Sequence, residues 1–410
     1  MKKIVTLLLV LTLVFVFVAS CDNGSKSNEP AASKQPPPKE IGMYDPNYDY
    51  NANPRYKVVY IVSSNTSGLY TASSYAFAHW ASVMNIDFQG MLDFAGDDDA
   101  LMSQLPQLAR DHDGLLMDAS ATTYDRVAEI MQETGTPWMS FMAAPRDYSI
   151  DTTPLLNTYV GFDQVDVGKY FADYLVDKAK ATWPGVPLSE FGFITVDFST
   201  APPLHEREMG CHARLLEIEP DLATNRYFVA DTSINFFDAV TSQQVVSAVL
   251  SMNPEIKRWI IFAEIDDMAQ GAAAALDLMG YTDDSWVSAF GGTALHNQWD
   301  AGSQDAWKSA IYLPQTIFTE PVICALYAYM NGDATPETIF PEWKNVHEDT
   351  SHGSFATRML PFYEILYDNY KHMLKWSDIY SGANFFPDYP SEGITRDSYS
   401  NTVPIPASYK

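Results

Sequence analysis

Short apolar runs alternate with longer stretches of helical period from Tyr56 onward, and this alternation constrains the fold more than any other feature. A strand that is apolar throughout is buried on both faces, and a helix after each strand supplies the cover. The pattern predicts an α/β fold with parallel sheets covered by helices on both sides. The predicted strands are residues 58–62, 114–117, 138–142, 191–196, 259–263 and 286–290.

Seven helices are predicted between and after these strands. They cover residues 74–84, 98–109, 123–135, 167–181, 206–219, 236–252 and 267–279. About 350 residues follow the N-terminal region, which is more than one hydrophobic core holds and is typical of two lobes. With 47% hydrophobic and 13% aromatic residues, the chain has enough apolar surface for both.

The N-terminus predicts export. Met1-Lys2-Lys3 precedes an apolar run over residues 4–19, which is typical of a signal peptide and too short for a membrane span. The run ends in Val18-Ala19-Ser20-Cys21, which resembles a lipobox. We therefore expect residues 1–20 to be a lipoprotein signal peptide, and Cys21 to carry a lipid that holds the protein on a membrane facing the periplasm or the cell exterior.

Residues 21–55 are rich in Ser, Asn, Pro and Lys and are predicted to form a flexible tether. The two other cysteines, Cys211 and Cys324, are too few for a disulfide framework, and we expect two buried free thiols, with a single bridge as the alternative.

The chain has 25 basic and 52 acidic residues, a net charge of −27. This charge excludes nucleic acid and anionic lipid as partners, because both would be repelled.

In open parallel sheets, ligands bind outside the carboxyl ends of the strands. The residues directly after each predicted strand are therefore the candidates for chemistry. They are residues 63–70, Asp118, residues 142–145, 197–207, 264–267 and 291–293, and Tyr312.

Several stretches resemble a known family. The most specific is residues 253–263, continued by Asp266-Asp267-Met268-Ala269, and a second is Arg207-Glu208-Met209-Gly210. Weaker matches are Gly161-Phe162-Asp163 and Tyr312-Leu313-Pro314. From about residue 56 to 374 the chain is similar to the type I periplasmic sugar-binding proteins, which bind ribose, arabinose or galactose.

The resemblance implies two Rossmann-like lobes joined by a three-segment hinge that closes around a ligand. Lobe I would comprise residues 56–162 and 313–331, and lobe II residues 163–312 and 356–374. Residues 375–410 have no clear family equivalent, and we expect this C-terminal extension to pack along the surface because it is rich in aromatic residues.

The resemblance also implies ligand-binding residues. Arg207 would donate two hydrogen bonds from its guanidinium, with a plain surface arginine as the alternative. Asp118 would face the ligand, with an N-cap for the helix that begins near residue 123 or a turn residue as the alternative, and Asp266 would contact the ligand or cap the next helix. Tyr70 would stack on a ring or pack in the core. Lower in rank, Ser63, Asn65 and Tyr312 would line the site.

The chain departs from the family at three ligand positions, where Met142, Ile265 and Gly291 replace Asp or Asn. Each unpaired ligand hydroxyl would cost about 1 to 3 kcal/mol. A common pentose or hexose bound in the family's usual way is therefore not expected, unless a nearby residue compensates or the ligand has fewer hydroxyls.

The leading hypothesis is a monomeric solute-binding lipoprotein that delivers a sugar or polyol to an ABC permease. Alternatives are a sensory module read by a receptor or kinase, a nucleoside-type ligand, and an extracellular enzyme. No catalytic motif supports an enzyme, and we expect no cofactor. We also expect no metal site: the loop around His347 and the run Asp97-Asp98-Asp99 are better explained as a polar loop and a helix cap, and His205 with His212 does not form a zinc motif.

Overall fold

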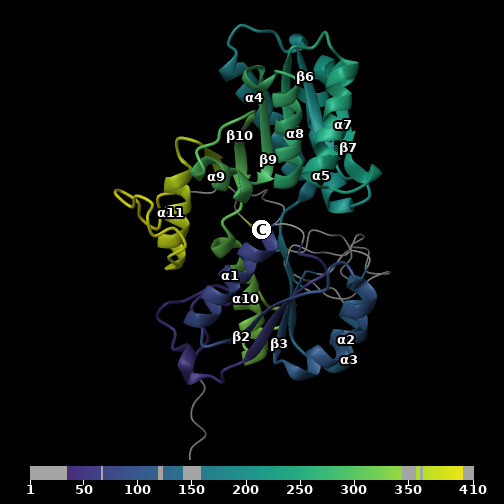
Figure 1. Cartoon of the computed structure of the whole chain (residues 1–410). Coiled ribbons are helices and arrows are strands. Elements are labelled where there is room, and N and C mark those ends of the chain that lie inside the picture. The colour runs from purple at the N-terminus through teal and green to yellow at the C-terminus, as the bar shows by residue number, and fades with distance from the viewer. Residues whose placement is uncertain are drawn as a thin grey trace, which may run out of the picture. The chain divides into compact units, whose positions relative to one another are not determined.

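The computed structural model describes residues 35–65, 68–118, 123–141, 158–343, 357–360 and 363–399. Two separate sheets, in which nearly all neighbouring strands are parallel, are each covered by helices (Figure 1). The predicted α/β fold with two lobes is confirmed. The expected lipid-carrying Cys21 and the site residue Met142 lie outside the described residues.

The sheet of lobe I has the strand order β2-β1-β3-β4, and all its neighbours are parallel. Alternate residues of β1 point to opposite faces: Val58 and Tyr60 enter one core, whereas Val59 and Ile61 enter another. The strands are β1 (Lys57–Val62), β2 (Asp87–Asp93), β3 (Gly114–Asp118) and β4 (Trp138–Ser140).

Helices cover both faces of this sheet. On one face lie α1 (Gly68–Val83) and α10 (Gln315–Asn331), and the Trp80 indole of α1 donates to the Thr316 carbonyl of α10 over 2.8 Å. On the other face lie α2 (Asp98–Asp111) and α3 (Tyr124–Thr134). Lobe I is therefore built from two distant parts of the chain.

The sheet of lobe II has the strand order β12-β10-β9-β8-β6-β7. All pairs are parallel except β12 with β10, so the chain returns along one edge in the opposite direction. The strands are β6 (Phe191–Asp197), β7 (Tyr227–Asp231), β8 (Arg258–Ala263), β9 (Ser285–Gly291), β10 (Trp307–Tyr312) and β12 (Tyr363–Leu366).

Two helices, α4 (Gln164–Thr182) and α5 (Pro202–Ile218), cover one face of this sheet. Their backbones touch at two glycines: a Cβ on Gly168 would lie 1.9 Å from the Arg207 carbonyl oxygen, and one on Gly210 would lie 2.1 Å from the Val165 carbonyl oxygen. The short α6 (Pro220–Asn225) follows α5. The opposite face carries α7 (Ala239–Met252), α8 (Asp266–Leu278), α9 (Thr293–Asp300) and α11 (Tyr370–Ser381).

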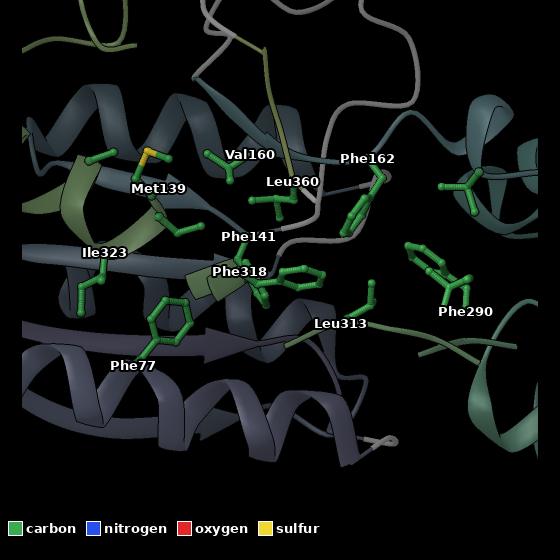
Figure 2. Close-up of a cluster of buried hydrophobic side chains, with 14 of the residues drawn as sticks. Phe77, Met139, Phe141, Val160, Phe162, Phe290, Leu313, Phe318, Ile323 and Leu360 are labelled. Carbon is green, nitrogen blue, oxygen red and sulfur yellow. The ribbon is translucent and has the colours of Figure 1, made fainter. Parts of the chain in front are cut away.

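Three segments connect the lobes, and each places one apolar side chain in a shared core: Phe162, Leu313 and Leu360 are at most 4% exposed (Figure 2). Two of the segments pair as β5 (Tyr159–Gly161) and β11 (Thr357–Met359). Because β11 pairs with β5, residues 357–359 belong to the connection, whereas the sequence had suggested lobe II from residue 356. The chain re-enters lobe II at β12.

The structure also differs from the expected flexible tether over its last part. Tyr48 and Tyr50 are buried, and the Tyr50 ring meets the Tyr327 ring of α10 edge-on at 5.2 Å. The Asn53 amide donates to the Tyr327 hydroxyl over 2.8 Å. Composition alone suggested a loose segment, but its tyrosines bury enough ring surface to hold this segment on lobe I.

Within the described residues 375–399 of the C-terminal extension, Phe386, Tyr389 and Tyr399 pack against the lobe II core. The predicted start of the extension at residue 375 falls inside α11, whose Trp376 is buried in the lobe II core. The same helix reaches lobe I, where the His79 ring donates to the Ser381 carbonyl over 3.0 Å. Cys211 and Cys324 are buried free thiols, and none of the described helices is long and apolar enough to span a bilayer.

Candidate functional site

The carboxyl ends of β1 and β3 bring four predicted residues of lobe I together. Ser63 follows β1 and its hydroxyl lies 3.5 Å from the Asp118 carbonyl oxygen at the end of β3. The Asn65 amide side chain donates to Thr71 over 3.2 Å on the first turns of α1, which also carries Tyr70. The prediction that these residues share one edge of the sheet agrees with the structure.

Asp118 is the electrostatic centre of this group. Burial raises the pKa of its carboxyl to about 7, and a hydrogen bond from the Tyr70 hydroxyl partly opposes the shift. The Asp118 charge in turn raises the pKa of Tyr70. Asp118 does not cap α3, whose N-cap position is Thr123. The helix-cap alternative therefore does not describe Asp118, and its contact with ligand stays a prediction.

In lobe II, Arg207 is not a surface residue: it is 4% exposed. Its Nε donates to the Gln164 side chain and its Nη1 to the Glu264 carbonyl oxygen, both over 2.7 Å. The guanidinium also stacks on the Phe290 ring at 4.6 Å. Arg207 therefore ties α5 to the ends of β8 and β9, and this structural role comes in addition to the predicted contact with ligand.

Asp266 and Gly291 form a structural turn. The Asp266 carboxylate accepts from the backbone amides of Gly292 over 2.6 Å and Ala294 over 2.8 Å. A side chain at Gly291, where φ is +146°, would place its Cβ 2.5 Å from Asp266 Oδ1. The family's acidic residue does not fit there, and Asp266 holds the start of α9. The prediction that Asp266 caps the helix directly after it is wrong, because the N-cap of α8 is Ile265.

Tyr312 is placed in the lobe II core rather than on a lining surface. It is 5% exposed and its ring meets His296 edge-on at 5.9 Å. Ile265, the second departure from the family pattern, packs against the same core. The Ile265 side chain has no hydrogen-bonding group.

An aromatic cluster that was not predicted from the sequence lies at the ends of β6 and β7. The rings of Phe236 and Phe237 stack at 4.1 Å, and Phe198 meets Phe237 edge-on at 5.0 Å. Phe236 remains 39% exposed. Residues 236–237 had been predicted as helix, but α7 begins only at Ala239 because Asp238 caps it by accepting from the Thr241 amide over 2.7 Å.

Polar groups lie beside these rings. The Ser199 hydroxyl donates to Asp231 over 2.7 Å and lies 3.0 Å from the Ser233 hydroxyl. Hydrogen bonds from both serines lower the pKa of Asp231, against an opposing effect of partial burial. The loops after β6 and β7 therefore combine ring faces, hydroxyls and an ionised carboxylate, which together can bind a ring with several polar substituents.

Comparisons with known proteins bear on the fold. A family model described as a periplasmic binding protein domain matches residues 81–322. An ABC transporter periplasmic solute-binding protein from Actinobacillus succinogenes with bound D-allose is 14% identical, with a TM-score of 0.60 over 77% of this chain and 99% of its own. A search of curated protein sequences gives no match.

Two further solved structures have the same fold. A solute-binding protein from Bacillus halodurans with bound myo-inositol has a TM-score of 0.57 at 16% identity, over 79% of this chain and 99% of its own. A carbohydrate transporter solute-binding protein from Agrobacterium radiobacter in complex with D-arabinose has a TM-score of 0.60 at 15% identity, over 78% and 98%.

Proposed function

Since the chain belongs to the periplasmic binding protein domain family, we propose that it is an exported solute-binding protein that captures a sugar or polyol for an ABC importer. The observation that carries the proposal is the aromatic cluster of Phe198, Phe236 and Phe237 beside the Ser199 and Asp231 hydrogen-bonding groups. Aromatic faces pack against the C–H side of a sugar ring while carboxylates accept from its hydroxyls.

The ligand proposal is supported by structures of similar fold that hold D-allose, myo-inositol and D-arabinose. In lobe II we place its hydroxyls near the ends of β6 and β7, because the Asp266 carboxylate, which follows β8, is already engaged by backbone amides. Asp231 would thus compensate for the acidic group that Gly291 lacks. In lobe I, Asp118 and Tyr70 would supply the opposing contacts.

A binding screen tests this proposal. D-allose, D-arabinose, myo-inositol and a set of nucleosides would be titrated into the purified protein by calorimetry, with melting temperature as a second measure, since a ligand stabilises the folded state that binds it. We expect at least one sugar or polyol to bind. If only nucleosides bound, the ligand class would be nucleosides and not sugars or polyols. Chemical modification of the ligand would indicate an enzyme.

Two variants locate the site once a ligand is found. Phe236→Ala should weaken its binding about tenfold, which corresponds to 1.4 kcal/mol for a lost ring contact. Tyr75→Ala serves as a matched control, because Tyr75 is an aromatic residue that is 65% exposed on α1. Equal affinities for the wild type and Phe236→Ala would remove the aromatic cluster from the site.

The membrane attachment is a separate part of the proposal. We place the lipid on Cys21, which follows the small residues of the lipobox-like stretch. Cells fed a radiolabelled fatty acid should label the wild type, and Cys21→Ala should abolish the label and release the protein from the membrane fraction. Import is tested by uptake of the identified ligand in a strain that lacks the gene, since a purely sensory protein would leave uptake unchanged.

A further inference from the structure

Lobe II contains a cluster of ionisable groups that the proposed function does not use. Asp197 ends β6, and His205 and Glu208 lie one turn apart near the start of α5. One ligand atom of each residue lies within 4.8 Å of the others. The His205 Nδ1 is 2.8 Å from Asp197 Oδ2 and 3.9 Å from Glu208 Oε2.

The burial of the acids distinguishes this cluster from an ordinary surface group. Asp197 is 1% and Glu208 7% exposed, whereas the His205 side chain is 40% exposed and leaves a path to solvent. Asp197 Oδ1 has no hydrogen-bond donor among the described residues. Buried carboxylate oxygens without a donor are costly unless a proton or a cation compensates them.

A third acid lies beside the cluster. Glu264 follows β8, the neighbour of β6, and is fully buried with its carboxyl against that of Asp197. Neither Glu264 oxygen has a well-aligned donor in the described part of the chain.

The residues around the cluster fix the orientation of the Glu208 carboxylate. The Tyr227 hydroxyl donates to Glu208 Oε1 over 2.8 Å, which leaves Oε2 on the side of His205. Tyr227 is itself fixed by the Thr195 hydroxyl at 2.9 Å and by stacking on His212 at 4.4 Å. Partners of this kind set the direction of metal ligands in proteins.

We propose that Asp197, His205 and Glu208 form a binding site for a divalent transition-metal cation of the Zn²⁺ type. Ligand atoms at about 2.1 Å from a tetrahedral ion lie about 3.4 Å apart, which is between the 2.8 Å and 3.9 Å that separate His205 Nδ1 from Asp197 and Glu208. One imidazole nitrogen and two carboxylates favour Zn²⁺ over Ca²⁺, which prefers oxygen ligands only. Three protein ligands leave at least one position for water or for an oxygen of a bound solute.

The site has a clear structural consequence. The cation would offset the charges of the buried acids and link the end of β6 to α5, the helix that also carries Arg207. It would therefore stabilise the folded protein by mass action. The proposal is independent of the transported solute and can be tested without one.

The test uses untagged protein that has been stripped with EDTA and dialysed. Calorimetric titration with Zn²⁺ should give one equivalent bound with a Kd below about 10 µM, and the melting temperature should rise. His205→Gln and Glu208→Gln should each weaken the binding at least about 100-fold. His372→Gln, a change at an exposed histidine of α11, should leave it unaffected.

Circular dichroism of the stripped variants shows whether they fold, and His205→Gln, at a half-exposed position, is the one expected to keep the native fold. Co²⁺ supplies a second measurement, because its visible absorption bands report nitrogen and oxygen ligands directly. Failure to bind Zn²⁺, equal binding by His205→Gln and the wild type, or preferential binding of Ca²⁺ would each overturn the proposal.

Discussion

Replacing Gly168 with alanine places a methyl group at the crossing of α4 and α5. An ideal Cβ at this position lies 1.9 Å from the Arg207 carbonyl oxygen and 2.7 Å from the Cys211 amide nitrogen. Ordinary van der Waals contact begins at 3.4 Å, so the helices would have to separate by about 1.5 Å. Both obstacles are backbone atoms, and no change of side-chain rotamer can relieve the clash.

The energetic effect follows from this geometry. Overpacking a core costs about 1–3 kcal/mol, and we expect at least the upper value because the obstacle is rigid. A displacement of α5 would also lengthen the Arg207 contacts to Gln164 and to the Glu264 carbonyl, each now 2.7 Å long. Gly168→Ala should therefore lower the free energy of unfolding by about 3 kcal/mol or more and weaken solute binding as well.

Urea unfolding followed by tryptophan fluorescence measures the change. Gly68→Ala is the matched control: Gly68 is the first residue of α1, and apart from its chain neighbours no atom of the described residues lies within 4 Å of its ideal Cβ. This control should be neutral or stabilise the protein by up to about 1 kcal/mol. If Gly168→Ala lowered the free energy of unfolding by less than about 1 kcal/mol, the close helix contact inferred here would be refuted.

Three further predictions concern buried polar groups. Burial raises the folded-state pKa of Glu320 to about 7 from 4.5, so its proton is lost more readily on unfolding and the stability that it contributes declines as the pH rises from about 4.5 to 7. Glu320→Gln should reduce this pH-dependent decline in the free energy of unfolding by up to about 3 kcal/mol. The measurement is the free energy of unfolding of each protein at pH 5 and at pH 8. Identical pH profiles for the variant and the wild type would contradict the prediction. Asp266→Ala should lower the free energy of unfolding by about 2–4 kcal/mol, because two backbone amides lose their acceptor. The control Asp267→Ala should lower it by less than about 1 kcal/mol. Equal losses for the two variants in urea titrations would contradict the assigned turn. Arg207→Met should destabilise the protein by about 2 kcal/mol in the same titrations, and an unchanged midpoint would count against its contacts to Gln164 and the Glu264 carbonyl.

The strands that the sequence predicted are those with apolar residues on both faces. β1, β6 and β8 are buried along nearly their whole length, which leaves an unbroken apolar run in the sequence. The unpredicted strands β2 and β7 lie at sheet edges, where exposed residues interrupt the run. The unpredicted strand β10 (Trp307–Tyr312) lies inside the lobe II sheet, and Lys308 and Ser309 interrupt its apolar run.

The candidate site was predictable where it follows a strand. Asp118 and Tyr70 were found because strand ends in a parallel sheet converge on one edge. Phe236 and Phe237 were missed because their apolar side chains extend the pattern of α7, although Asp238 directly after them is a recognisable N-cap. The cluster of Asp197, His205 and Glu208 has no motif spacing, since a loop between strand and helix brings its members together.

The shared core at the connections also affects how the chain folds. Phe318 and Val322 of α10 cover the face of the first sheet that carries Val58, yet α10 starts at Gln315 and β4 ends at Ser140. Lobe I is therefore incomplete until the whole of residues 141–314 has been made, and its contacts have high sequence separation. Such a topology folds slowly and leaves an apolar sheet face uncovered on the growing chain. Neither lobe would form a stable protein if expressed alone as one continuous fragment.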